Sequence, residues 1–279
     1  MKGQIISLSG NSFTVKSQTE TVTLSARGKL KKETILVGDF VEYANGCIEK
    51  IYPRSSSFIR PAVANIDLVL AVISPVPKPD YTILDKLLIS AISQGVEVVI
   101  VINKIDIESD LPTEVNTEYE NSGVKIVTIS AKNGENIEQL KTLMKGKFTA
   151  LAGQSAVGKS TLVNTLFGLQ LKTGEVSEKI GRGKHTTTKS TVYDLDGYKI
   201  IDTPGFYTLE SFVTPEELGE YYPEFSSVFG KCKFRGCSHT GEIGCAVKAL
   251  VESGEISKGR YERYIEIYKQ LKDKKQLYK

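Results

Sequence analysis

The chain of 279 residues has no tryptophan, only two histidines and four cysteines, and no long apolar run. The strongly apolar stretch at 96–102 is far shorter than the about 20 residues that cross a bilayer, and Glu97 interrupts it. The first ten residues lack the apolar core of a signal peptide. We therefore expect a soluble, cytoplasmic protein without a membrane partner, where cysteines more often ligate metal than form disulfides.

The net charge of +3 is unevenly distributed. Residues 1–62 hold nine basic and five acidic side chains, a net of +4, and residues 258–279 hold eight and three, a net of +5. The rest of the chain therefore carries 3 − 9 = −6. Basic ends favour a polyanionic partner such as RNA, although lysine-rich faces that only keep a protein in solution fit about equally well.

Residues 1–62 predict an all-β, OB-like barrel as a first domain. Short β-rich segments alternate with turn signals such as Gly10-Asn11 and Asn45-Gly46. The expected strands are Gln4–Leu8, Ser12–Lys16, Thr21–Ser25, Phe40–Tyr43 and Cys47–Ile51. An oligonucleotide-binding barrel is one option, and other small barrels fit the pattern equally well. The polar stretch 54–61 is typical of a linker.

Residues 63–210 alternate strand and helix patterns, which predicts an α/β domain with a mostly parallel sheet. The expected strands are Asp67–Ile73, Val98–Ile102, Lys125–Ile129 and Phe148–Ala152, with a hairpin of Thr191–Leu195 and Tyr198–Ile201. The expected helices are Tyr81–Gln94, Asn136–Met144 and Lys159–Phe167. Residues 211–279 are expected to form a mainly helical third domain.

A phosphate-binding loop follows the strand that ends at Ala152. The segment 153–160 fits G-x-x-x-x-G-K-[ST] between a strand and a helix, where backbone N–H groups surround phosphate oxygens. Lys159 is expected to reach the β- and γ-phosphates, and the Ser160 hydroxyl is expected to ligate magnesium. The residues expected to contact the phosphates are Gly153, Gln154, Ser155, Ala156, Val157, Gly158, Lys159, Ser160 and Thr161.

Two other motifs predict recognition of guanine. In Asn103-Lys104-Ile105-Asp106, the carboxylate of Asp106 can accept hydrogen bonds from guanine N1–H and the exocyclic amine, which adenine cannot supply in that arrangement. Asn103 is expected either to touch the base or to tie loops together, and the Lys104 stem is expected to cover the ring. In Ser130-Ala131-Lys132, the Ala131 N–H is expected to contact guanine O6.

A fourth motif, Asp202-Thr203-Pro204-Gly205, predicts a nucleotide-sensing switch. Asp202 is expected to hold magnesium through water, and the Gly205 N–H to sense the γ-phosphate. A second switch is expected in the polar segment 173–188, where Thr187 would complete the magnesium shell. A plain turn and a connector without a metal role are the respective alternatives.

Phe206 stands where many GTPases place a glutamine that orients the attacking water. We therefore expect slow intrinsic hydrolysis, or hydrolysis that depends on another group. His185 is one candidate for that group, and an exposed loop histidine without a role is an equal alternative.

The four residues Cys232, Cys237, His239 and Cys245 have the spacing C-x4-C-x-H-x5-C. Three thiolates and one imidazole predict a closed, structural zinc site. The last helix then places tyrosines and aliphatic residues on one face, which predicts packing against the protein body. Its arginines and lysines, Arg260 and Arg263 among them, are expected to meet phosphates or solvent.

The order of the motifs is unusual, because the base-reading motifs precede the phosphate loop and the switch motif. All four GTPase motifs are present but in a rotated order, which predicts a circularly permuted P-loop GTPase domain. The whole chain closely resembles the RsgA (YjeQ) family of bacterial small-ribosomal-subunit biogenesis GTPases. That resemblance implies an OB-fold barrel, binding of GTP and GDP, and partnership with the small ribosomal subunit and its rRNA. It also implies hydrolysis stimulated by the subunit and a role in late subunit maturation.

One residue departs from the family pattern, since Ala156 stands where the family's loop usually has glycine. Alanine adopts positive φ only at a cost, so we expect somewhat weaker nucleotide binding without loss of function. Nothing in the sequence indicates more than a monomer. Alternative functions are an RNA-binding scaffold that holds nucleotide with little turnover, an ATP-dependent enzyme, and a GTPase that acts on transfer RNA or membranes.

Overall fold

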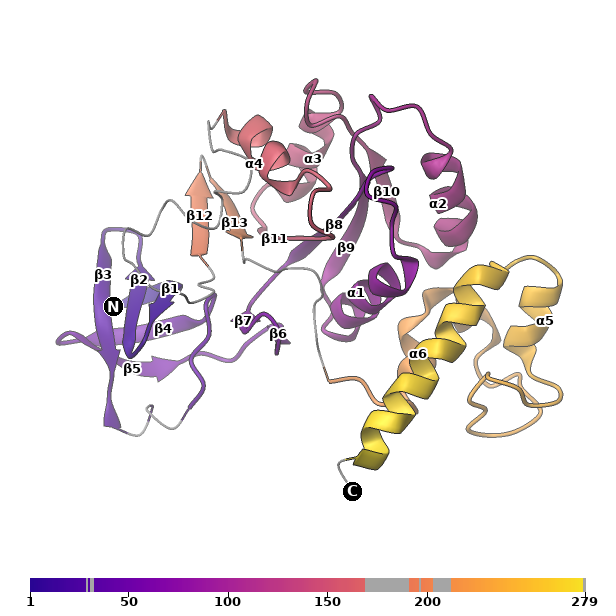
Figure 1. Ribbon diagram of the computed structural model, residues 1–279. Coiled ribbons are helices and arrows are strands. Elements are labelled where there is room, and N and C mark those ends of the chain that lie inside the picture. Colours follow the sequence, from indigo (N-terminus) through magenta and orange to yellow (C-terminus); the bar gives the residue numbers. More distant parts are fainter. Residues whose placement is uncertain (29, 31–32, 169–190, 196, 203–211, 278–279) are drawn as a thin grey trace.

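The computed structural model describes residues 1–277 except 29, 31–32, 169–190, 196 and 203–211, and it has three parts (Figure 1). A small barrel lies on the left, a sheet covered by helices lies in the centre, and a helical part with the long last helix lies on the right. Across the described ranges, no helix has both the length and the apolar character needed to cross a membrane.

The barrel is built from five strands. They are β1 (Lys2–Ser9), β2 (Ser12–Lys16), β3 (Thr21–Ala26), β4 (Phe40–Ala44) and β5 (Cys47–Ile51). Strands β1–β2–β3 and β4–β5 pair antiparallel, β3 pairs parallel with β5, and β1 pairs with β4 to close the barrel. Alternate side chains such as Ile5, Val15 and Val41 fill its core. The predicted OB-like barrel is confirmed.

The central sheet has the strand order β10-β9-β8-β11-β13-β12. Its members are β8 (Leu68–Ile73), β9 (Glu97–Ile102), β10 (Lys125–Thr128), β11 (Phe148–Ala152), β12 (Thr191–Leu195) and β13 (Tyr198–Asp202). All neighbours pair parallel except β12 and β13. The predicted α/β architecture is therefore confirmed.

Helices cover both faces of this sheet. Alternate side chains of each strand point to opposite faces, and because the central strand β8 is apolar along its whole length both faces must be buried. Leu68, Leu70 and Val72 pack with α3 (Ile137–Met144) and α4 (Lys159–Phe167). Their neighbours Val69 and Ala71 face the opposite way, toward α1 (Tyr81–Ser93) and α2 (Leu111–Tyr119). Helix α2 is missing from the sequence prediction, because only three of its nine residues are buried and a proline stands in its first turn.

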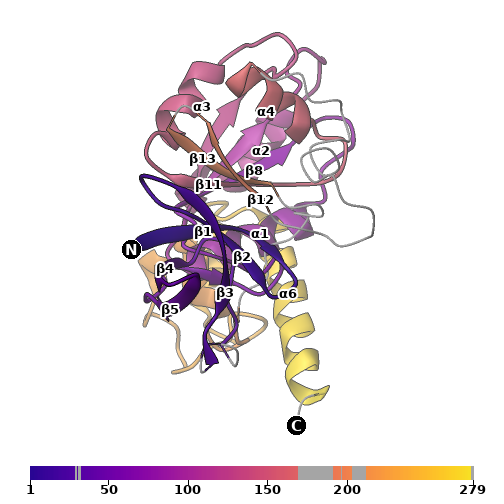
Figure 2. The same ribbon diagram turned by 90° about the vertical axis from the view of Figure 1, so that its left-hand side faces the viewer.

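The barrel and the sheet form one continuous eleven-stranded sheet. The junction is a pairing of β1 with β12 at Ser7 and Thr191, supported by a 3.0 Å ion pair between Lys16 Nζ and Asp194 Oδ2. Figure 2 shows this junction from the barrel side.

The prediction of a linker at 54–61 is wrong. Arg54 forms an ion pair with the buried carboxylate of Asp39 at 2.7 Å, and Phe58 lies in the core under the sheet. The segment also forms β6 (Ser57–Phe58), which pairs with β7 (Val63–Ala64). The polar composition concealed a packed segment, because the Ser56 hydroxyl donates to the Ile66 carbonyl and the Ser55 N–H donates to Asn65 Oδ1.

The third part contains short 3₁₀ turns, α5 (Ala246–Glu252) and α6 (Lys258–Leu277). The turns are η3 (Leu218–Tyr221) and η4 (Pro223–Val228), and a further one, η2 (Glu120–Ser122), follows α2. The predicted apolar face of α6 is confirmed, because Tyr261 and Tyr264 are buried in a core with Tyr222 and Phe225. Ile89 of α1 belongs to the same core, so one helix of the central part is shared with the third.

The expectation for Arg260 and Arg263 is wrong, because neither guanidinium is available to phosphates or solvated. Arg260 is 1% exposed and bonds Asp85 of α1 at 2.5 Å and Glu224 at 2.6 Å. Arg263 bonds Asp85 at 2.6 Å and Glu118 at 2.8 Å. Burial opposes the charge on Arg260, but the carboxylates of Asp85 and Glu224 raise its pKa. This ionic cluster fastens α6 to the central part.

Candidate functional site

Three of the four predicted nucleotide motifs lie at one edge of the central sheet. Asn103 follows β9, Ser130 comes two residues after β10, and Gly153 follows β11. The carboxyl ends of parallel strands meet at the same edge, where open α/β sheets bind ligands. The backbone of Asp202 ends the parallel strand β13 at that edge as well.

Asn103 joins the base motifs to the phosphate loop. Its Nδ2 donates to the Val157 carbonyl at 2.9 Å, and its Oδ1 accepts from the Ala131 N–H at 3.0 Å. The side chain is 2% exposed, so these bonds lie out of water and hold the loops in register. Of the two roles expected for Asn103, the structure has it tying loops together.

The two glycines of the phosphate loop are required by close approach of neighbouring atoms. A Cβ on Gly153 would lie 2.1 Å from the Val72 carbonyl oxygen, and its φ is +140°. A Cβ on Gly158 would lie 2.4 Å from Asn103 Nδ2, and its φ is +98°. Any side chain at Gly158 would therefore break the link between the two kinds of motif.

Two lysines lie across the phosphate loop. Lys159 Nζ donates to the carbonyls of Gly153 and Gln154 at 2.6 and 2.7 Å. Lys104 Nζ donates to the carbonyls of Ala156 and Val76 at 2.7 and 2.5 Å. Both amines therefore lie beside the segment expected to hold the phosphates, and each is held by carbonyls whose bonds an anion can replace.

Asp106 is exposed and faces the second base motif. Its Oδ1 accepts a hydrogen bond from Ser130 Oγ at 2.7 Å. That bond is the main reason why the pKa of the carboxyl lies below its ordinary value, so the group is an ionised acceptor at neutral pH. Lys132, also exposed, lowers the same pKa through its charge. The Ala131 N–H already donates to Asn103, so binding to guanine O6 requires that bond to be shared or exchanged.

The structure also shows supporting contacts that the sequence did not reveal. Thr165 of α4 donates to the Ala131 carbonyl at 2.6 Å, which fixes the second base motif against the helix after the phosphate loop. The Asp80 N–H donates to Gln154 Oε1 at 3.2 Å, and Asp80 also caps α1. The role of Thr165 could not be predicted, because no sequence pattern distinguishes a threonine six residues after Lys159 from an ordinary helix residue.

Several predicted site residues lie outside what the structure describes. His185, Thr187 and Gly205 fall in the undescribed ranges, and the side chain of Asp202 is likewise not described. Ser160 and Thr161 lie half-buried at the start of α4, directly after Lys159.

Ala156 adopts the left-handed backbone conformation, with φ of +63°. This conformation costs an L-residue about 1–2 kcal/mol. Glycine would remove that strain, but it would also make the unfolded chain more flexible, which offsets part of the stabilisation. We therefore expect Ala156→Gly to raise the free energy of unfolding by about 0.5–1 kcal/mol, measured by urea denaturation. Ser155→Gly is the matched control, because exposed Ser155 lacks positive φ and glycine there should be destabilising. A destabilising Ala156→Gly would contradict this view.

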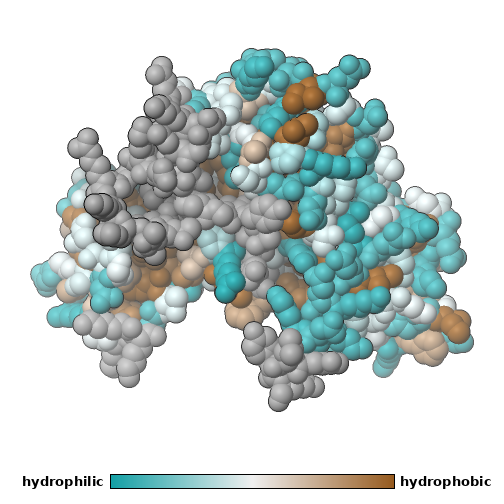
Figure 3. Space-filling view, in the orientation of Figure 1, coloured by the Kyte–Doolittle hydropathy of each residue, from teal (hydrophilic) through white to brown (hydrophobic). Residues whose placement is uncertain are grey.

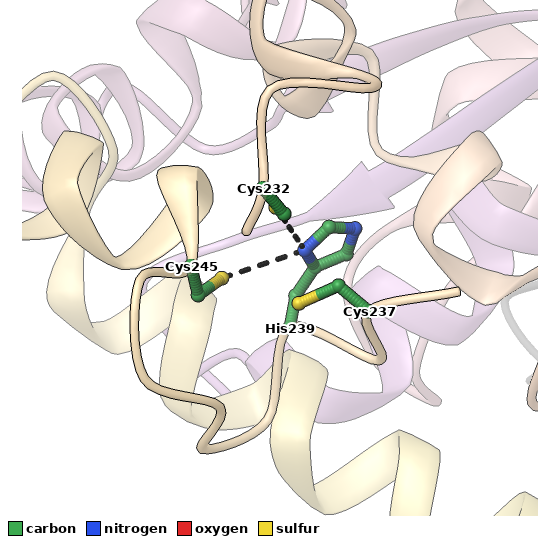
Figure 4. Close-up of side chains that lie close together, drawn as sticks. All are labelled: Cys232, Cys237, His239 and Cys245. Carbon is green, nitrogen blue, oxygen red and sulfur yellow. Dashed lines mark hydrogen bonds between the residues drawn. The ribbon is translucent and has the colours of Figure 1, made fainter. Parts of the chain in front are cut away.

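The cysteine and histidine motif forms a compact cluster in the third part (Figure 4). The ligand atoms of Cys232, Cys237, His239 and Cys245 all lie within 4.8 Å of one another, and His239 Nδ1 is 3.5 Å from two of the sulfurs. A tetrahedral zinc with ordinary bond lengths places sulfur and nitrogen ligands about 3.5 Å apart. The spacing therefore fits the edges of a zinc tetrahedron better than weak S–H hydrogen bonds.

The surroundings of the cluster orient its ligands. Tyr261 and Tyr264 of α6 donate to the carbonyls of His239 and Ser238 at 2.7 Å each. Burial lowers the pKa of His239, which favours the neutral imidazole that a metal needs. Burial also raises the pKa of the Cys237 thiol to about 12, so a cation is required to hold the thiolate.

We expect Cys237→Ser to lose one zinc per chain, because three ligands no longer close the tetrahedron. Metal content by mass spectrometry and hydrogen exchange of residues 230–245 measure the loss and the local unfolding. Cys47→Ser is the control, since half-buried Cys47 lies in the barrel and should leave metal content unchanged. Full zinc content in Cys237→Ser would contradict the assignment.

Comparisons with known proteins agree with this geometry. A family model described as RsgA GTPase matches residues 51–212, and one described as RsgA N-terminal domain matches residues 2–47. The chain is 41% identical to the small ribosomal subunit biogenesis GTPase RsgA of Ruminiclostridium cellulolyticum, over 97% of this chain and 94% of that one. The protein of the same name from Thermotoga maritima is also 41% identical, over 97% and 96%.

Two solved structures are similar over nearly the whole chain. The crystal structure of YjeQ from Thermotoga maritima has a TM-score of 0.82 at 37% identity, covering 97% of this chain and 98% of that one. The structure of YloQ, described as a circularly permuted GTPase, has a TM-score of 0.74 at 31% identity, covering 98% and 95%.

Proposed function

Because this chain belongs to the RsgA family of GTPases, we propose that it is a GTP-hydrolysing switch in late maturation of the small ribosomal subunit. The observation that carries the proposal is the pair of hydrogen bonds made by the Asn103 side chain, which joins the guanine motifs to a phosphate loop that begins fifty residues later in the sequence. Two relatives named small ribosomal subunit biogenesis GTPase support the choice of partner. Stimulation of hydrolysis by the subunit is tested directly by the assay described below.

The residues divide the chemistry among them. Asp106 selects guanine through its ionised carboxylate, and Asn103, Lys104 and the segment 130–132 hold the base site. Backbone N–H groups of 153–160 receive the phosphates, and Lys159 exchanges its carbonyl partners for phosphate oxygens, where it stabilises charge on the transferring group. Ser160, Thr187 and Asp202 would hold a magnesium ion, which supplies further charge neutralisation between the phosphates.

The water-orienting group is part of the proposal. Phe206 lacks the amide of the usual glutamine, so His185 is proposed to approach the water when the subunit binds. Full subunit-stimulated turnover in His185→Ala would remove this role.

The barrel is proposed to grip rRNA, with residues 1–62, 63–210 and 211–279 acting as three domains. Its charge of +4 favours a polyanion, and the Nζ atoms of Lys2 and Lys50 lie 4.8 and 5.2 Å from the ring centre of Tyr52. The zinc site is proposed to be structural. A factor that acts on the small subunit works in the cytoplasm, and we propose that it acts there as a monomer.

The test is phosphate release from GTP with and without purified small subunits. Subunits should raise the rate of the wild type, and Lys159→Ala should stay at background in both conditions. Lys145→Ala, at an exposed lysine outside the site, should behave as the wild type. GTP binding without stimulated release would instead favour the rival function, a nucleotide-holding RNA scaffold.

A further inference from the structure

The segment between the first two zinc ligands carries an exposed aromatic ring among basic side chains. Phe234 is 52% exposed, and Lys231, Lys233 and Arg235 around it are all exposed. The stretch 229–241 contains no acidic residue. Figure 3 shows an apolar patch at the lower right edge of the molecule, over the loops of the third part.

The backbone that carries this ring is anchored on both sides. Cys232 and Cys237 fix both ends of the segment at the metal cluster, and the Lys233 N–H donates to the Gly244 carbonyl at 3.0 Å. Ile243, next to that carbonyl and 81% exposed, adds apolar surface beside the segment. A backbone anchored in this way loses little conformational entropy when a flat ligand stacks on the ring that it carries.

The charges near the ring suit an anion. Lys233 Nζ lies 5.5 Å from the ring centre of Phe234. The carboxylate of Glu242, the nearest acid in the sequence, accepts from the Ser238 hydroxyl and from the N–H groups of Ser238, Thr240 and Gly241 rather than from these basic side chains. An exposed aromatic ring with unneutralised lysine and arginine neighbours is the pattern that binds unpaired bases and their phosphates.

We propose that Phe234 is a stacking platform for one unpaired base of single-stranded RNA, with Lys231, Lys233 and Arg235 on the flanking phosphates. The inference rests on the proposed function, and within it assigns the zinc-ligand segment its own RNA contact, separate from the barrel. Duplex RNA is a poor occupant, because its bases are already stacked on one another. A protein partner is disfavoured by the charge of the segment.

The test measures binding of the full, zinc-loaded chain to a fluorescent 12-mer of oligouridylate. Phe234→Ala should weaken binding by about 5- to 150-fold, the range for loss of one base-aromatic stack, and Phe234→Trp should restore it. Phe212→Ala is the matched control, because Phe212 is 86% exposed but the charged residues nearest to it in the sequence are the acids Glu210, Glu216 and Glu217, and binding should be unchanged. Zinc content of each variant verifies the fold of the segment.

A second readout locates the contact. A 12-mer with 5-iodouridine should photocrosslink to Phe234, because this base reacts with stacked rings, and mass spectrometry identifies the residue. With small subunits, Phe234→Ala should raise the subunit concentration for half-maximal hydrolysis and leave the maximal rate unchanged.

The proposal is overturned if the wild type does not bind the single strand, or if Phe234→Ala binds and crosslinks as the wild type does. It is also overturned if Phe234→Ala weakens the subunit response but not RNA binding, since the occupant is then a protein. Failure of the proposed function looks different, because subunits would then stimulate no variant, including the wild type.

Discussion

Replacing Asp106 with asparagine should transfer the preference of the site from guanine to xanthine nucleotides. In the proposed site the carboxylate would accept two hydrogen bonds from guanine, and hydrogen bonds to charged groups contribute about 1.5–3 kcal/mol each. We therefore expect GTP affinity to fall by about 10²- to 10⁴-fold. Xanthine carries a carbonyl in place of the exocyclic amine, so the asparagine amide can donate to it, and xanthosine triphosphate should gain affinity.

Calorimetric titration with GTP, xanthosine triphosphate and ATP measures this exchange. Glu108→Gln is the control, because Glu108 is an exposed acid two residues away and should not alter either affinity. Wild-type affinity for GTP in Asp106→Asn would mean that the base binds elsewhere, and it would contradict the assignment of Asp106 as the guanine-recognising residue. A gain for ATP instead would favour the rival ATP-dependent enzyme.

Asp85→Ala should strongly destabilise the attachment of α6. The Asp85 carboxylate is fully buried and accepts from Tyr119 Oη at 2.6 Å, Arg260 Nη1 at 2.5 Å and Arg263 Nε at 2.6 Å. Its removal leaves the buried Arg260 with only Glu224 as an ionic partner. Breaking a buried ion pair from one side costs about 3–5 kcal/mol, because the remaining charge stays desolvated.

Denaturant unfolding measures that loss, and limited proteolysis should show earlier cleavage between the central part and the C-terminal helices. Glu138→Ala is the comparison, since its ion pair with Lys141 is 84% exposed on the glutamate side, and such pairs contribute only about 0.2–1 kcal/mol. A loss below 1 kcal/mol in Asp85→Ala would mean that apolar packing alone holds α6.

The barrel, the parallel sheet and the loop motifs were predictable because each has a local signal. Alternation of apolar residues marked the strands, and the glycine positions of the phosphate loop follow from backbone approach that no other residue permits. The spacing of Cys232, Cys237, His239 and Cys245 likewise indicated a metal cluster before any geometry was known.

The ionic cluster at α6 was not predictable, because its partners lie 175 residues apart along the chain. A charged residue on the apolar face of a helix, as Asp85 is between Leu84 and Leu88, was the one available signal, and it names no partner. In the sequence the basic side chains of α6 therefore resembled an RNA-binding face, although Arg260 and Arg263 form ion pairs with buried carboxylates.

A crystal structure of the chain with magnesium and a non-hydrolysable GTP analogue tests the central claim most directly. We predict one bound nucleotide, with the guanine edge on the Asp106 carboxylate and the β- and γ-phosphates on Lys159 Nζ, and Asn103 still joining the two loops. A nucleotide that contacts only one of these residues, with the other facing a separate cavity, would contradict the account.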